Sequence, residues 1–275
     1  MAATLRTPLQ ALLSTPHVVR RGLSSTRPWY GSYSDSKRWL RRQHKDVYVR
    51  EAQRQQLRAR SAFKLREIDE KYRLIFPGAR CIDCGAAPGG WSQVLAEGVY
   101  SRQQRPLKRP QTADSNQKDS TSSHKSSQSD NSLPTSLHEM ETADSIWAVD
   151  LLPMEPISGV TVCQMDFTLP QAKARLRALL GGELVDLIVS DMAPSFTGTH
   201  SIDHIRTMNL CEDALYFAQD LLRPGGAFVC KFIMGGTERE FKLLLQTKYT
   251  KVRVFKPKSS RADSSEAYFV CLGKR

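Results

Sequence analysis

Short apolar runs alternate with helical patterns along most of the chain. The apolar runs that predict buried strands are 81–84, 146–149, 160–165, 184–190 and 226–231. The patterns that predict helices are 61–72, a segment starting at Trp91, 169–180, 205–222 and 237–246. Strands that alternate with helices are typical of a parallel sheet covered by helices, so an α/β domain is expected. Two last runs, 252–255 and 267–272, are close enough to pair as an antiparallel hairpin at one sheet edge.

A small, glycine-rich loop follows the first predicted strand. Residues 80–91 read RCIDCGAAPGGW, so a strand containing Asp83 gives way to the loop 85–90 and then to a helix. Glycines let a ligand approach the backbone, and a helix N-terminus offers free N–H groups. The spacing is not G-x-G-x-x-G, so the dinucleotide fingerprint is not met. Alone, the loop is a weak signal, and a strand-to-helix turn without a ligand is the alternative.

Four later strands each end in a polar residue that a buried strand has no need of. They end in Asp150, Asp166, Asp191 and Lys231. In an open parallel sheet, ligands bind beyond the carboxyl ends of the strands. The sequence therefore predicts that these four side chains and Gly85 meet at one edge of the sheet.

The first 60 residues differ in composition from the rest. Residues 1–34 contain arginines, Ser and Thr but no Asp or Glu, a pattern typical of a mitochondrial transit peptide; the alternative is a basic tail. In 35–60, basic residues interleave with Trp39 and Tyr48. Such a segment can follow phosphates and stack on bases, although a solvated helix face has a similar composition.

Residues 101–144 interrupt the α/β pattern. They are rich in Ser, Gln, Asp, Lys and Pro and poor in apolar residues, so they cannot bury enough surface to offset chain entropy. A disordered surface insertion is expected. The domain is then predicted to span 35–275, with a basic helical extension at its start.

Bulk properties narrow the class of protein. The chain has 275 residues, 40% of them hydrophobic, and a formal net charge of +12, which favours a polyanionic partner but is also common in mitochondrial proteins. No apolar run is long enough to span a membrane. Cys81 and Cys84 should point to opposite faces of a strand, which argues against a redox or zinc pair. His200 and His204 are interpreted as parts of a polar loop, and no metal site is expected.

Several motifs occur in an order that matches one family. The chain resembles the FtsJ/RrmJ-type ribosomal-RNA 2′-O-methyltransferases over about 45–273, apart from the insertion. The transit-like start is similar to that of the mitochondrial member of the family. The motifs that carry the resemblance are DCGAAPGGWSQ (83–93), VDLLPM (149–154), SDMAP (190–194), RPGG (223–226), VCK (229–231) and KPKSSR (256–261).

The resemblance implies a fold, a cofactor and a set of catalytic residues. The fold is the Rossmann-like methyltransferase fold, a seven-stranded, mostly parallel sheet with helices on both faces and the last strand antiparallel. The cofactor is S-adenosylmethionine. The catalytic residues are a Lys-Asp-Lys-Glu tetrad, matched here by Lys64, Asp191, Lys231 and Glu266.

The resemblance also assigns the cofactor contacts. The methionine part lies over Pro88, Gly89, Gly90 and Trp91. The remaining cofactor contacts are assigned to Asp150 for the ribose hydroxyls, Asp166 for the adenine amino group, and Asp191, which is shared with the tetrad. Asp150 and Asp166 could each alternatively be a helix cap or turn residue.

Methylation of a ribose hydroxyl needs a base, because the hydroxyl is a poor acid. Lys231 can serve only when neutral. Burial and the nearby Lys64 favour the neutral amine, whereas Asp191 and Glu266 favour the ammonium form. Lys231 is therefore predicted as the base, with the other three as orienting and electrostatic partners. Enzymes that methylate amino groups more often carry Asn/Asp-Pro-Pro-aromatic after strand four, so the sequence favours oxygen over nitrogen.

The predicted function is S-adenosylmethionine-dependent 2′-O-methylation of a uridine in the A-loop of mitochondrial large-subunit rRNA. The predicted location is the mitochondrial matrix, the predicted partner is the assembling large subunit, and a monomer is expected. Two alternatives remain open: methylation of a tRNA anticodon-loop ribose, and a non-catalytic assembly factor that only binds RNA.

Overall fold

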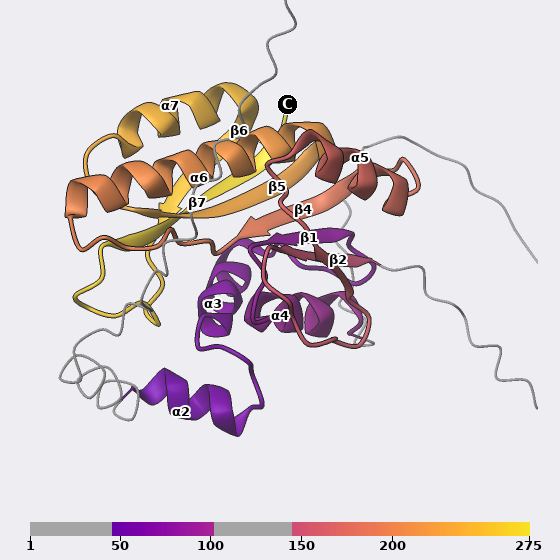
Figure 1. Ribbon diagram of the computed structural model, residues 1–275, viewed down its shortest axis with the longest axis horizontal. Coiled ribbons are helices and arrows are strands. Elements are labelled where there is room, and N and C mark those ends of the chain that lie inside the picture. The colour runs from indigo at the N-terminus through magenta and orange to yellow at the C-terminus, as the bar shows by residue number, and fades with distance from the viewer. Residues whose placement is uncertain (1–45, 102–144) are drawn as a thin grey trace, which may run out of the picture. The chain divides into compact units, whose positions relative to one another are not determined.

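A computed structural model describes residues 46–101 and 145–275 and contains one seven-stranded sheet (Figure 1). The strand order is β3-β2-β1-β4-β5-β7-β6. All neighbouring strands are parallel except β7, which is antiparallel to both β5 and β6. The predicted α/β class, the mostly parallel sheet and the antiparallel hairpin at one edge are therefore confirmed. The predicted transit segment and insertion lie outside the described residues.

The elements largely follow the predicted ranges. The strands are β1 (Cys81–Cys84), β2 (Ile146–Asp150), β3 (Thr161–Gln164), β4 (Val185–Ser190), β5 (Leu222–Ile233), β6 (Tyr249–Phe255) and β7 (Glu266–Lys274). The helices are α2 (Val47–Arg54), α3 (Ala62–Tyr72), α4 (Gly90–Val99), α5 (Pro170–Leu179), α6 (His200–Leu221) and α7 (Glu238–Lys248).

Helices cover both faces of the sheet, as predicted. Helices α3 and α4 lie on one face and α5, α6 and α7 on the other (Figure 1). Each face has its own apolar cluster, because successive strand residues point to opposite sides. Cys81 belongs to the cluster under α3 and α4, and Cys84 to the other. Both thiols are free and buried, so the prediction that they point apart is confirmed.

Strand β5 begins at Leu222, so the predicted turn 223–226 lies within it, and two of the strand ends near the predicted site residues also differ from the prediction. Strand β3 ends at Gln164, so Asp166 lies in the turn that follows it. Strand β5 runs two residues past Lys231 to Ile233, because it pairs with β7 as far as Glu266. Lys231 is thus an inner residue of its strand, where a neighbouring strand constrains its direction.

The predicted polar loop around His200 and His204 was wrong, since both residues lie in the first turns of α6. His204 is buried, with Nδ1 2.6 Å from the carbonyl oxygen of Ile233 and Nε2 2.6 Å from the hydroxyl oxygen of Thr237. The imidazole therefore ties α6 to the segment between β5 and α7. Within 46–101 and 145–275, no three His, Cys, Asp or Glu side chains are grouped so that they could hold a metal ion. None of the helices in these ranges is both long and apolar enough to cross a membrane.

Candidate active site at the carboxyl edge of the sheet

The structure brings the four tetrad residues together in two ion pairs. Lys64 Nζ lies 2.5 Å from Glu266 Oε1, and Lys231 Nζ lies 3.1 Å from Asp191 Oδ1. Lys231 Nζ also donates to the backbone oxygen of Asp191 at 2.6 Å. Tyr268 joins the pairs, because its hydroxyl lies 2.6 Å from Asp191 Oδ1 and 3.3 Å from Glu266 Oε1. The result is one connected group of two cations, two carboxylates and a phenol.

Strand register and helix packing place these side chains. Lys231 on β5 and Tyr268 on β7 are directly opposite in the antiparallel ladder, so they point to the same face. Lys64 reaches the same place from α3, which is anchored to the sheet by fully buried Leu65 and Ile68. The four charged side chains are at most 17% exposed, so each interaction acts with little screening by water.

Asp191 is an ionised carboxylate at neutral pH. Burial acts to raise its pKa, but the nearby ammonium groups of Lys231 and Lys64 and the hydrogen bond from Tyr268 outweigh burial. The pKa of Asp191 therefore lies below its ordinary value. Burial raises the pKa of Tyr268 well above its ordinary value, and the carboxylates of Asp191 and Glu266 raise it further. Tyr268 thus remains a protonated hydrogen-bond donor.

Sequence reasoning missed Tyr268 and Ser260. Tyr268 could have been found, because it lies two residues after Glu266 and so shares its face of β7. Ser260 Oγ donates to Glu266 Oε1 at 3.1 Å from the loop between β6 and β7. Loop residues follow no hydrophobic periodicity, so the contact of Ser260 with Glu266 could be found only from the structure.

A cavity of about 620 Å³ lies beside the tetrad. It lies where β1 and β4 are neighbours although they are not consecutive in the chain, the usual ligand position in open α/β sheets. Asp191 lines the cavity and also contacts Lys231, so it connects the two parts of the site. The other residues that line the cavity include Gly85, Ala87, Asp150, Leu152, Met165, Asp166, Phe167, Thr168 and Met192.

Two of the three acids that line the cavity accept hydrogen bonds within turns and still have lone pairs available for a ligand. Asp150 accepts hydrogen bonds from the backbone N–H groups of Ala87 and Leu152, both at 2.8 Å. Asp166 Oδ1 accepts from the N–H and the hydroxyl of Thr168, at 3.0 and 2.6 Å. The turn role considered as an alternative is therefore present at both acids. A carboxylate has about four lone-pair sites, so these bonds leave room for hydroxyl or amino donors of a ligand.

The glycine-rich loop shapes the cavity through Gly85. Its φ is +73°, and a Cβ there would lie 2.1 Å from Met192 Cγ, so only glycine fits. The loop contributes Gly85 and Ala87 to the lining, rather than 88–91. The ring of Trp91 is 2% exposed, and its indole N–H donates to the backbone oxygen of Ser61 at 2.9 Å. This hydrogen bond ties the start of α4 to the start of α3.

Pro88, Gly89 and Gly90 lie at the start of α4, beside Arg58. The Arg58 guanidinium donates to the backbone oxygens of Pro88 and Glu155, at 3.2 and 2.5 Å. It therefore holds the glycine-rich loop against the segment after β2. The contact predicted between 88–91 and the methionine part of a cofactor stays a prediction.

Comparisons with known proteins identify the family of the chain. The model of the FtsJ-like methyltransferase family matches residues 57–274. The chain is 39% identical to the ribosomal RNA large subunit methyltransferase E of Roseobacter denitrificans over 245 residues, which cover 89% of this chain and 88% of that protein. It is 41% identical to the enzyme of the same name from Xanthobacter autotrophicus, with 89% and 81% coverage.

A solved structure supports the fold. A protein described as a ribosomal RNA methyltransferase from Plasmodium falciparum matches with a TM-score of 0.57 and 23% identity, covering 79% of this chain and 98% of that one. The paired tetrad and its adjoining cavity thus occur in a chain that matches a methyltransferase family over most of its length. The chain belongs to the FtsJ-like methyltransferase family.

Proposed function

We propose that this protein is an S-adenosylmethionine-dependent 2′-O-methyltransferase of large-subunit ribosomal RNA. The observation that carries the proposal is the contact of Lys231 with Asp191, which also lines the adjoining cavity. A candidate base and a candidate cofactor site are thereby linked through one carboxylate. The names of the relatives support ribosomal RNA as the substrate class.

The cavity suits the chemical groups of the cofactor. Asp150 and Asp166 offer carboxylate acceptors for ribose hydroxyls and an adenine amino group, and Met165 and Phe167 offer apolar walls. When bound, S-adenosylmethionine supplies an electrophilic methyl group on a sulfonium. Asp191 places negative charge between the cavity and the two lysines, which suits a cationic ligand.

Lys231 is the proposed base. Its Nζ is held by two oxygens of Asp191, so the amine is positioned rather than free to rotate. In its neutral form it accepts the proton that a ribose 2′-hydroxyl loses. Lys64 is paired with Glu266, and the Tyr268 hydroxyl donates to Asp191 and lies 3.3 Å from Glu266 Oε1, so these residues hold the base and balance charge.

The finer part of the proposal concerns the target and its location. The target is a uridine in the A-loop of mitochondrial large-subunit rRNA, modified in the matrix by a monomeric enzyme during large-subunit assembly. This rests on the family resemblance and on the acid-free residues 1–34. Fusing 1–34 to a fluorescent protein tests the location: a mitochondrial signal is expected, and a diffuse cytosolic signal would contradict it.

The activity test uses the full chain, cofactor carrying a labelled methyl group, and an A-loop hairpin RNA. Label should enter the hairpin and should be lost when the target uridine is replaced by 2′-deoxyuridine, because the accepting oxygen is then missing. A tRNA anticodon stem-loop serves as the competing substrate. Label that persists in the deoxy-substituted hairpin, or that enters only the tRNA fragment, would overturn the assignment.

A further inference from the structure

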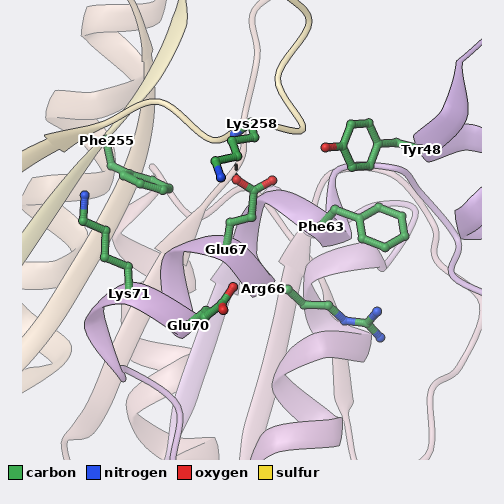
Figure 2. A pocket seen from close by; sticks show the side chains of 8 residues that line it. All are labelled: Tyr48, Phe63, Arg66, Glu67, Glu70, Lys71, Phe255 and Lys258. Carbon is green, nitrogen blue, oxygen red and sulfur yellow. Dashed lines mark hydrogen bonds between the residues drawn. The ribbon is translucent and has the colours of Figure 1, made fainter.

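A separate concavity lies on α3, the helix that carries Lys64 (Figure 2). Its volume is about 690 Å³, within the range of roughly 300–1,000 Å³ that is usual for small-ligand sites. It is formed by α2, α3, the end of β6 and the loop after β6. The lining residues are Tyr48, Phe63, Arg66, Glu67, Glu70, Lys71, Phe255 and Lys258.

Three partly exposed aromatic rings line this concavity. Tyr48 and Phe63 lie at one end, with ring centroids 5.5 Å apart, and Phe255 lies at the other (Figure 2). Phe63 and Phe255 also pack against the apolar cluster under α3 and α4, so their rings are held in place. Fixed aromatic faces at a surface are what unstacked nucleobases bind, because every base has a π-face.

Cations accompany the rings. Lys71 Nζ lies 4.7 Å from the ring centroid of Phe255, and Arg66 lies 5.7 Å from that of Phe63. Lys71 and Lys258 are exposed, so their ammonium groups can reach the phosphates of a polyanion.

Two acids in the lining have different roles. The carboxylate of Glu67 is engaged by the backbone N–H groups of Lys258 and Ser259, at 2.6 and 2.8 Å, so it fixes the loop after β6. Glu70 is exposed and offers an acceptor for the amino group of a base. Glu67 is therefore occupied within the protein, whereas the carboxylate of Glu70 faces solvent at the concavity.

The same two chain segments build the concavity and the active site. Helix α3 carries Phe63 beside Lys64, which pairs with Glu266. The loop after β6 carries Lys258 into the concavity and Ser260 onto Glu266. A strand of RNA whose ribose reaches the tetrad therefore passes close to these rings.

We propose that this concavity binds an unstacked nucleotide of the RNA substrate, near the nucleotide that is methylated. Its base stacks on Phe255 or on the Tyr48–Phe63 pair, and its phosphates contact Lys71 and Lys258. The inference rests on the proposed function, because it takes RNA as the substrate. It adds a binding site outside the tetrad and the cofactor cavity.

The test compares two substitutions of one ring. Phe255→Leu keeps an apolar side chain but removes the aromatic face, and Phe255→Trp keeps such a face. Affinity for the A-loop hairpin should fall about tenfold in Phe255→Leu and stay near wild type in Phe255→Trp, as expected for loss of one stacking contact. The matched control is Tyr216→Leu on α6. Tyr216 resembles Phe255 in having a lysine beside its ring, with Lys173 Nζ 5.2 Å from the ring centroid, and it is 77% exposed. Helix α6 covers the other face of the sheet, so this ring is not part of the concavity.

Three further measurements distinguish the loss of an RNA contact from a disturbed fold or active site. Phe255→Leu should leave cofactor affinity and the single-turnover rate at saturating RNA unchanged. Lys71→Gln and Lys258→Gln should each lower the slope of the logarithm of RNA affinity against the logarithm of salt concentration by about one. Hairpins carrying 5-iodouridine beside the target should crosslink to peptides containing Tyr48 or Phe255. If Phe255→Leu does not fold, Tyr48→Leu against Tyr48→Phe makes the same comparison.

The outcomes distinguish the two proposals. Unchanged RNA affinity in the folded leucine variant, or crosslinks found only elsewhere, would overturn the nucleotide site while methylation by the wild type still supports the function. A wild type that crosslinks at these rings but transfers no methyl group would overturn the proposed function and leave the site standing.

Discussion

The two halves of the candidate active site are built in different ways. The tetrad half consists of charged side chains from α3, β5, β7 and the segment that follows β4, and each cation is matched by a carboxylate. The cavity half consists of a glycine loop and two acids whose carboxylates are partly occupied by backbone N–H groups. The first half therefore depends on which side chains are present, and the second on the path of the backbone. Changes in the first should affect the rate, and changes in the second should affect ligand affinity.

The largest effect is expected at Lys231. Lys231→Ala should lower the single-turnover rate by about 10²–10⁴-fold, the usual contribution of a positioned base, while cofactor affinity stays near wild type. Lys231→Arg should not restore the rate, because arginine stays protonated. Lys173→Ala, which breaks an exposed ion pair with Asp220, is the control. Substantial activity in Lys231→Arg would mean that the lysine only positions the substrate and that another group is the base.

A buried acid beneath the glycine loop should make stability depend on pH. Burial raises the pKa of Asp83 to about 7, despite a hydrogen bond from Ser92 at 2.7 Å. Within the described ranges, Asp83 Oδ1 has no hydrogen-bond partner. A carboxyl whose pKa is raised by folding makes its full contribution to the stability of the folded state at pH values below its pKa in the unfolded chain. This contribution is lost as the pH rises through its pKa in the folded protein.

The free energy of unfolding of the wild type should therefore fall by up to about 4 kcal/mol between pH 4 and pH 8 relative to Asp83→Asn. Urea titrations at several pH values measure this difference. If the free energies of unfolding of the wild type and Asp83→Asn depend on pH in the same way, Asp83 is ionised in the folded protein. The cavity half of the site would then contain a third negative charge, at a buried position.

A smaller effect is expected in the cavity half. Asp150→Ala removes a charged acceptor, which costs roughly 1.5–3 kcal/mol, so affinity for S-adenosylmethionine should fall about tenfold to a hundredfold. The rate at saturating cofactor should change much less. Calorimetry measures the affinity, and Asp213→Ala on the exposed face of α6 is the control. Equal affinities for the wild type and Asp150→Ala would remove Asp150 from the cofactor site.

The smallest effect is expected at Tyr268, which joins the two ion pairs. Tyr268→Phe removes a hydroxyl but leaves both lysine–carboxylate pairs intact. The methylation rate should fall only about twofold to tenfold, because the phenol acts on the rate through two carboxylates that keep their lysine partners. The ring centroids of Tyr268 and Trp91 lie 5.6 Å apart, so the substitution can also affect packing, and thermal stability should be measured in parallel. A rate loss as large as that of Lys231→Ala would mean that the phenol takes part in the chemistry.

Much of the fold could be predicted because its determinants are local. Apolar runs bounded by turns located six strands closely, and polar residues at their ends indicated one ligand-binding edge. Helix α6 was predicted from residue 205, so its first turn, which contains His200 and His204, was missed. A buried polar residue such as His204 resembles a loop residue until its partners are known. The position of Lys231 inside β5 was also missed, because the length of that strand is set by its pairing with β7.

The sequence by itself determined the family, the α/β class and the residue types of the tetrad, because these depend on short motifs and on hydrophobic periodicity. The tertiary structure decided which lysine pairs with which acid, that Tyr268 and Ser260 join the group, and that Trp91 is buried under α3. It also brought Tyr48, Phe63 and Phe255 to one surface concavity. Such contacts join residues far apart in the chain. They follow from strand register and helix packing, for which no short stretch of sequence carries the information.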